Sequence, residues 1–152
     1  MNKHAPKDYS DPNSFAGADE HSHQVALMAA CAQYAFNGVP ELKWFHAVPN
    51  GGSRGDSARS AQIEGARLKA EGVKRGVADC SLPVARQGYH GFYIEMKRPG
   101  ALGAQSKEQK EFEAFCKEQE YLYAVFENWW SAFRALMWYL GFEHTRGWRL
   151  PE

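Results

Sequence analysis

Residues 88–100 read GYHGFYIEMKRPG, and this stretch decides the fold. Side chains along a strand alternate between its two faces, so the apolar residues of segment 91–97 point one way while Glu95 and Lys97 point the other. The apolar face belongs to a core, and the two charged groups are same-face neighbours roughly 7 Å apart along the strand. The stretch therefore predicts a half-buried strand that carries a charged pair.

The segment before it supplies a second acid. Residues 80–84 form another β-prone run, and the six residues that separate it from 91–97 are few enough to predict an antiparallel hairpin. Pro83 places the first strand of the pair near a sheet edge or a bulge. Asp79 precedes that strand, so the hairpin brings it back towards Glu95. Two carboxylates about 4 Å apart repel by about 4 kcal/mol at an effective dielectric of 20, which favours a bound cation. Oxygen ligands suit Mg²⁺ or Mn²⁺ better than zinc.

Periodic patterns elsewhere predict helices around this hairpin. Asp19 caps a helix that ends at Asn37, and its apolar stripe is expected to face the core. The members of that stripe are Val25, Met28, Ala29, Ala32 and Phe36. Residues 42–48 are expected to form a strand that ends at the turn 49–52, and a polar surface helix should follow from about Ser57 to Glu71.

The C-terminal half shows the same kind of alternation. Ser106 caps a third helix with Gln109 at the capping-box position, and Phe112, Phe115 and Cys116 form its stripe. Residues 121–126 are expected to form a strand. Asn128 caps a last helix, whose inward side chains are expected to be Trp129, Phe133, Leu136, Met137 and Leu140. Its aromatic residues fit a core or a subunit interface.

This order of elements predicts an α/β fold with a mixed β-sheet flanked by helices. The 152 residues, 44% of them apolar, support a single core. We expect a flexible tail over 1–18, one domain over 19–140 and a C-terminal tail over 141–152.

Charge and cysteine content exclude several protein classes. The formal net charge is +0, from 18 basic and 18 acidic residues, so a protein that coats nucleic acid through overall positive charge is excluded. Residues 54–75 are locally basic, with six basic and three acidic side chains, although a solvated helix surface explains this equally well. Three distant cysteines suggest neither a disulfide framework nor a zinc ribbon. With no signal peptide and no apolar run long enough to span a membrane, we expect a cytoplasmic protein.

Five segments together resemble one nuclease family. They are Glu20 with Gln24, HAVPNGG (46–52), EGARLKAEGVKRGVADC (64–80), GYHGFYIEMKRPG (88–100) and SKEQ (106–109). In this order they are similar to the virus-type replication-repair nucleases (VRR-NUC), a branch of the PD-(D/E)XK superfamily, and the resemblance extends from Glu20 to about Ala135. The implied fold is restriction-endonuclease-like. Ala78 departs from the family pattern, which has Pro there, but that position supplies no reactive group.

The resemblance also implies roles for particular residues. Asp79 and Glu95 would be metal ligands beside the main-chain carbonyl of Met96, and Lys97 would be the catalytic lysine. Glu20 would be an additional acidic group at the metal, and Gln109 a helix residue that faces the site.

Structural alternatives exist for each role. The three central residues could form a surface ion-pair cluster, Glu20 is favoured anyway at a helix N-terminus, and Gln109 could serve only the cap. His46 and Asn50 either contact substrate phosphates or hold the turn. Five basic residues are candidates for contact with the nucleic-acid backbone, namely Arg54, Arg59, Arg67, Lys74 and Arg75.

We therefore expect a Mg²⁺-dependent (or Mn²⁺-dependent), structure-selective DNA endonuclease. Compact stand-alone members of the family resemble Holliday-junction resolvases that act as homodimers on four-way junctions. A monomeric flap or nicking nuclease is one alternative, and a catalytically silent DNA-binding accessory module is another.

Overall fold

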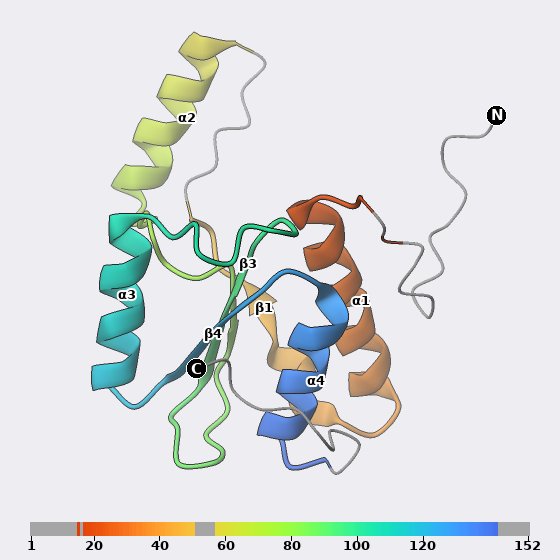
Figure 1. Ribbon diagram of the computed structural model, residues 1–152. Coiled ribbons are helices and arrows are strands. Elements are labelled where there is room, and N and C mark those ends of the chain that lie inside the picture. The colour runs from red at the N-terminus through yellow and green to blue at the C-terminus, as the bar shows by residue number, and fades with distance from the viewer. Residues whose placement is uncertain (1–14, 16, 51–56, 143–152) are drawn as a thin grey trace, which may run out of the picture.

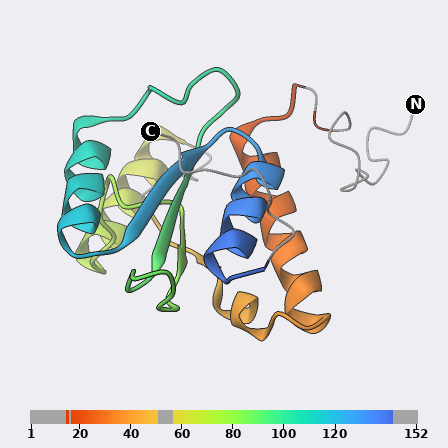
Figure 2. The same ribbon diagram turned by 60° about the horizontal axis from the view of Figure 1, so that its bottom comes forward.

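The computed structural model describes residues 15, 17–50 and 57–142. A four-stranded mixed sheet with helices on both faces forms the body, which confirms the predicted fold class (Figures 1 and 2). The strand order is β1 (His46–Ala47), β2 (Cys80–Leu82), β3 (Phe92–Met96) and β4 (Leu122–Phe126). The first three strands pair antiparallel, as the hairpin prediction requires, and β4 is parallel to β3.

Two helices cover one face of the sheet and a third covers the other. The first two are α1 (Glu20–Phe36) and α4 (Trp129–Tyr139), and the third is α3 (Lys107–Glu118) (Figure 2). The remaining helix, α2 (Ala58–Ala70), projects from the body in Figure 1 and contains no buried residue, as expected for a polar surface helix.

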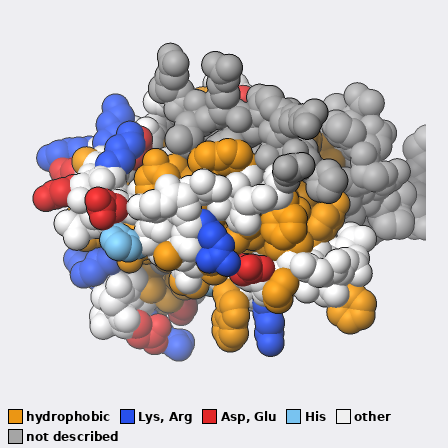
Figure 3. Space-filling model, turned by 90° about the horizontal axis from the view of Figure 1, so that it is seen from below, with side chains coloured by type: hydrophobic (Ala, Val, Ile, Leu, Met, Phe, Trp, Pro, Cys, Tyr) orange, Lys and Arg blue, Asp and Glu red, His pale blue; other side chains and the backbone are white. Residues whose placement is uncertain are grey.

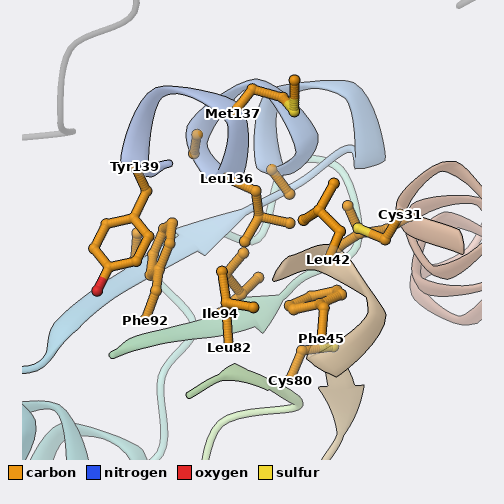
Figure 4. Close-up of a cluster of buried hydrophobic side chains, with 14 of the residues drawn as sticks. Cys31, Leu42, Phe45, Cys80, Leu82, Phe92, Ile94, Leu136, Met137 and Tyr139 are labelled. Atoms are coloured by element: carbon orange, nitrogen blue, oxygen red, sulfur yellow. The ribbon is translucent and has the colours of Figure 1, made fainter. Parts of the chain in front are cut away.

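The main core lies between the sheet and the α1–α4 layer (Figure 4). Phe92, Ile94 and Met96 of β3 are fully buried there and Tyr93 packs against the opposite cluster, so the predicted alternation is confirmed. The strand is not half-buried as predicted, because Glu95 on the second face is only 1% exposed. Tyr139 of α4 is also buried, and its hydroxyl donates a hydrogen bond to the carbonyl of Val84 at 2.6 Å, which ties the hairpin connection to the helix. A smaller cluster under α3 contains Ala78, Cys116 and Tyr123.

The predicted strand over residues 42–48 is wrong in its first half. Residues Pro40–Trp44 form a short 3-10 helix, η2, and only His46 and Ala47 belong to β1. The cause is Pro40, which stands at the start of η2 and whose ring fixes a backbone angle suited to a helical turn. Leu42 and Phe45, three residues apart, then both reach the core.

The bounds of α1 are as predicted, but the predicted core face is wrong. The Asp19 side chain accepts a hydrogen bond from the Ser22 main-chain N–H at 2.8 Å, so the cap is confirmed. The buried residues are His23, Ala26, Leu27 and Cys31, whereas Phe36 is 91% exposed. Because α1 is rich in small apolar residues on several sides, two stripes fit the helical period, and the packing of η2 and α4 selects the other one.

Smaller differences have similar causes. Phe115 was expected in the stripe of α3 but is 54% exposed, while Cys116 is buried. Pro83 ends β2 rather than marking an edge, since β2 lies between β1 and β3. The large aromatic residues of α4 pack against the core, in agreement with the core interpretation.

The proposed tails are largely outside the described residues, as are Arg54 and the glycine pair of the predicted turn. Within the expected N-terminal tail, Phe15 is 3% exposed, with its ring 5.2 Å from that of His23. Among the residues described, we find no helix with the length and apolar character required to cross a membrane.

Candidate active site

Strand pairing brings Asp79 and Glu95 together. Cys80 lies opposite Ile94 in the β2–β3 pair, so the next residue outward, Asp79, comes opposite Glu95. The Asp79 Oδ2 atom accepts a hydrogen bond from the Met96 main-chain N–H at 2.8 Å. Its main-chain carbonyl accepts another from the Val48 N–H at 2.8 Å. Asp79 is therefore held where the ends of three strands meet.

Glu95, Lys97 and Gln109 form a closed polar cluster beside it. Lys97 Nζ lies 2.8 Å from Glu95 Oε1, and Gln109 Nε2 donates a hydrogen bond to the same carboxylate oxygen. Lys97 Nζ also donates to Gln109 Oε1 at 3.2 Å. The Glu95 and Lys97 side chains are only 2% and 12% exposed, so this cluster is no solvated surface ion pair.

Gln109 fills both of the roles that the sequence left open. Its Oε1 atom accepts a hydrogen bond from the Ser106 main-chain N–H at 2.9 Å, and the Ser106 hydroxyl accepts one from the Gln109 N–H at 3.2 Å. This capping box begins α3 and directs the amide end of Gln109 onto Glu95. The helix start and the site are thus one structural unit.

The pKa values of three acidic side chains, Glu95, Asp79 and Glu20, are raised at this site. Burial, and then the charge of Asp79, raises the pKa of Glu95 to about 7, although Lys97 opposes the shift. Burial also raises the pKa of Asp79, against the hydrogen bonds from Met96 and Asn50 and the charge of Lys97. The pKa of Glu20 is raised first by burial and next by Asp79, while Lys97 and a main-chain hydrogen bond from Arg98 lower it. The single positive charge of Lys97 does not neutralise the negative charges of three partly buried carboxylates.

The donor set fits a hard divalent cation. Glu95 Oε2 is buried and has no hydrogen-bond partner among the described residues, a state that is unfavourable for a carboxylate unless a cation binds it. In the described part of the chain, no three His, Cys, Asp or Glu side chains approach closely enough to hold a metal by themselves. The side-chain ligands at hand are thus the two carboxylates of Asp79 and Glu95, with water to complete them, and such oxygen ligands suit Mg²⁺ or Mn²⁺.

Glu20 lies near the proposed metal ligands but is not grouped closely with them. It is the first residue of α1, and it reaches the main chain of Arg98, just beyond Lys97. Its charge interacts with Asp79 and Lys97, but it does not complete a three-carboxylate cluster.

The basic residues predicted to contact nucleic acid lie on α2 and in the segment that follows it, outside the polar cluster of the site. Arg59 and Arg67 are exposed on α2, and Lys74 and Arg75 are exposed in the segment after it. The Arg67 guanidinium forms an ion pair with Glu71 at 2.9 Å. In Figure 1, α2 projects from the end of the molecule where α1 and α3 begin, which is also the end that carries Glu20 and Gln109.

His46 and Asn50 have partners that the sequence did not reveal. The His46 ring lies 2.8 Å, through Nδ1, from the carbonyl of Trp44. Asn50 Nδ2 donates a hydrogen bond to Asp79 Oδ1 at 2.6 Å. The motif HAVPNGG marked Asn50 as a residue of interest, but no pattern in the sequence indicated Asp79 as its partner.

Comparison with known proteins gives one informative result. No family model matches the chain, and no curated protein matches it. A solved structure described as a "VRR_NUC domain protein" is similar, with a TM-score of 0.64 and 26% identity, over 82% of this chain and 89% of that one. The similarity covers most of both chains and agrees with the mixed sheet and its flanking helices. The similarity therefore supports a VRR-NUC domain in this chain, as the sequence resemblance predicts.

Proposed function

We propose that this protein is a metal-dependent, structure-selective DNA endonuclease that hydrolyses phosphodiester bonds. The observation that carries the proposal is the buried Glu95 carboxylate, which has one oxygen without a partner and lies beside Asp79 and Lys97. A protein that needed these groups only for stability would lose little by replacing them with apolar residues. The similarity to a VRR_NUC domain protein supports the same conclusion.

Each residue of the site has a distinct task in this proposal. Asp79, Glu95 and the Met96 carbonyl would hold Mg²⁺ or Mn²⁺, with Glu20 as an additional acid. When bound, the ion supplies Lewis acidity, which activates water and stabilises charge on the phosphate and the leaving oxygen. Lys97 orients the attacking water or stabilises the charge that develops on the phosphate. Gln109 holds Lys97 and Glu95 in place through its two amide atoms.

The substrate we propose is branched DNA, with a four-way junction as the preferred form. Arg59, Arg67, Lys74 and Arg75 would contact backbone phosphates from α2 and the segment after it, together with Arg54, which lies outside the described residues. The sequence also makes His46 and Asn50 candidates for phosphate contact, although the hydrogen bond from Asn50 to Asp79 gives Asn50 a competing role. A homodimer in the cytoplasm would present two sites about a two-fold axis, so that paired nicks fall on opposite arms.

The proposal is tested by incubating the purified protein with Mg²⁺ and labelled four-way junction, flap and linear duplex. We expect symmetric nicks in the junction, and no cleavage in excess EDTA. Cleavage of flaps alone would indicate a monomeric flap nuclease instead. Binding without cleavage of any substrate would indicate a silent accessory module.

A further inference from the structure

Asn50 makes a contact that its position in the chain does not explain. It lies three residues after β1 ends at Ala47, yet its side chain reaches Asp79, which precedes β2. The Val48 N–H donates to the Asp79 carbonyl at 2.8 Å and so continues the β1–β2 pairing. The Asn50 Nδ2 atom then donates to Asp79 Oδ1 at 2.6 Å, from a half-buried position. The amide must present its NH₂ end here, because a carboxylate only accepts hydrogen bonds.

The Asp79 carboxylate is held at both of its oxygen atoms. Oδ1 accepts from Asn50, and Oδ2 accepts from the Met96 N–H at 2.8 Å. The Met96 donor belongs to β3 and the Asn50 donor to the segment after β1, so together they fix the rotation of the carboxylate plane. Each carboxylate oxygen offers about two lone-pair positions, so one on each oxygen remains free for a further ligand.

An uncharged donor is what this position requires. A lysine or arginine at residue 50 would neutralise Asp79 and compete with a cation for its oxygens. An aspartate would add a like charge to a region that already holds three acids. The amide orients the carboxylate but leaves its negative charge uncompensated.

We propose that Asn50 is a positioning residue, which holds the Asp79 carboxylate in the orientation that binds the divalent cation. This inference rests on the proposed function, because it assigns Asp79 the task of metal ligand. Partners of this kind typically contribute 10- to 100-fold to metal affinity or activity. The competing interpretations are a direct contact between Asn50 and a DNA phosphate, and a purely structural bond that holds the loop.

The test compares Asn50→Leu, which keeps the approximate shape but has no donor, with the unaltered full-length protein. Mn²⁺ binding is measured by calorimetry without DNA, and duplex binding by fluorescence anisotropy in EDTA. We expect the Mn²⁺ Kd to rise about 10-fold or more, while DNA affinity in EDTA stays within about two-fold. Raising the Mn²⁺ concentration should restore much of the cleavage rate. A loop-holding role alone would leave metal affinity unchanged.

Two further variants keep the result interpretable. Gln33→Leu removes an exposed amide from α1 and should change neither measurement. Asn50→Ser keeps a hydrogen-bond donor on a shorter side chain, so it should lose less Mn²⁺ affinity than Asn50→Leu. If Asn50→Leu does not fold, Asn50→Ser takes its place in the comparison.

The outcomes separate this inference from the proposed function. If the unaltered protein binds no Mn²⁺, both are overturned. If the unaltered protein binds Mn²⁺ and the Asn50 variants bind it equally well, only the positioning role is overturned. A loss of DNA affinity in EDTA, with Mn²⁺ affinity unchanged, would assign Asn50 to phosphate contact instead.

Discussion

Glu95 is an acid that the fold buries almost completely, and its environment works against its ionisation. Its pKa in the folded protein is about 7, well above the ordinary value of 4.5, because burial and the charge of Asp79 both disfavour the charged form. A raised carboxyl pKa means that the folded state binds the proton more tightly than the unfolded chain does. The contribution of Glu95 to stability is therefore most favourable at low pH and becomes unfavourable as pH rises from about 4.5 to about 7.

Replacing Glu95 with Gln should consequently stabilise the metal-free protein at high pH. The neutral amide has no charge to bury, so the free energy of unfolding in EDTA at pH 8 should exceed that of the unaltered protein by on the order of 3 kcal/mol. Near pH 4.5 the difference should shrink towards zero. Urea unfolding at the two pH values measures this. A difference that does not depend on pH would contradict the assignment of the raised pKa to Glu95.

Lys97 should be essential for the reaction and nearly dispensable for the fold. Its amine contacts Glu95 and Gln109, two residues of the site, so Lys97→Ala is expected to reduce DNA cleavage by at least 10²-fold while the protein still unfolds cooperatively. Asp79→Ala should in addition weaken metal binding. Single-turnover cleavage with Mg²⁺ and thermal unfolding provide the two readouts. Lys110→Ala, an exposed position on the same helix as Gln109, is the matched control.

The site could be predicted from the sequence to the extent that it depends on local geometry. Strand alternation placed Glu95 and Lys97 on one face, the short hairpin returned Asp79 to them, and the capping pattern located Gln109. The partner of Asn50 could not be predicted, since that hydrogen bond spans 29 residues and depends on how three strands meet. The absence, among the described residues, of a hydrogen-bond partner at Glu95 Oε2 could not be predicted either, because it depends on tertiary packing, which no local sequence pattern encodes.

At the scale of elements, the start of α3 is fixed by its contact with the segment that follows α2. Gly76 has φ +82°, and a Cβ atom there would lie 2.5 Å from the main-chain carbon of Glu108. Glu108 is next to Gln109, so this close approach also determines where the amide of Gln109 lies. A side chain at residue 76 would force α3 away from the sheet.

Gly76→Ala should therefore damage both stability and activity. We expect a loss of about 2–4 kcal/mol, from the strained backbone angle and from overpacking against the helix. Cleavage should fall even where the protein remains folded, because Gln109 is displaced. The matched control is Gly65→Ala in the middle of α2, where nothing lies within 4 Å, and where the substitution should stabilise the helix by about 0.5–1 kcal/mol. Chemical unfolding and cleavage rates measured on both variants test this, and equal stability of the two would contradict it.

Helix and strand boundaries were more predictable than helix faces. The predicted caps at Asp19, Ser106 and Asn128 all occur, because a cap is a contact within three residues. The buried face of α1 was predicted wrongly, since the choice between two apolar stripes depends on which elements pack against it. The strand predicted over η2 was wrong for a local reason, since Pro40 outweighs the β propensity of its neighbours.

The isolation of α2 leads to a prediction about DNA binding. Since the helix buries no residue, Arg59→Ala should change the free energy of unfolding by less than about 0.5 kcal/mol. If Arg59 contacts a phosphate, the slope of the log of DNA affinity against the log of salt concentration should decrease in magnitude by about 1 in the variant, the value for one lost phosphate contact. Arg134→Ala, an exposed position on α4, serves as the control and should leave the slope unchanged. An unchanged slope for Arg59→Ala would remove α2 from the DNA-binding surface.

On the scale of the whole molecule, exposed apolar surface gathers at the C-terminal end of α1 and on η2. Phe36 is 91% exposed and Trp44 is 62% exposed. Phe36 lines an apolar groove of about 450 Å³, whose other lining residues come mainly from α1 and η2 and include Met28 and Leu42. Figure 3 shows hydrophobic side chains exposed on this side of the molecule. In Figure 1 the same region lies at the far end from the starts of α1 and α3.

This surface is where the proposed homodimer should form. The large aromatic residues of α4, which the sequence also offered for an interface, already pack against the core, so they provide less free area. Contact through α1 and η2 would bury Phe36 and Trp44 and leave both active sites open to DNA.

Phe36→Glu should then convert the dimer to a monomer in light scattering. It should also abolish paired nicking of a four-way junction while single nicks persist. Phe115→Glu on α3, another exposed phenylalanine, should have neither effect. A dimer that survives Phe36→Glu, or a wild-type monomer that still makes symmetric nicks, would show that paired cleavage does not depend on this surface.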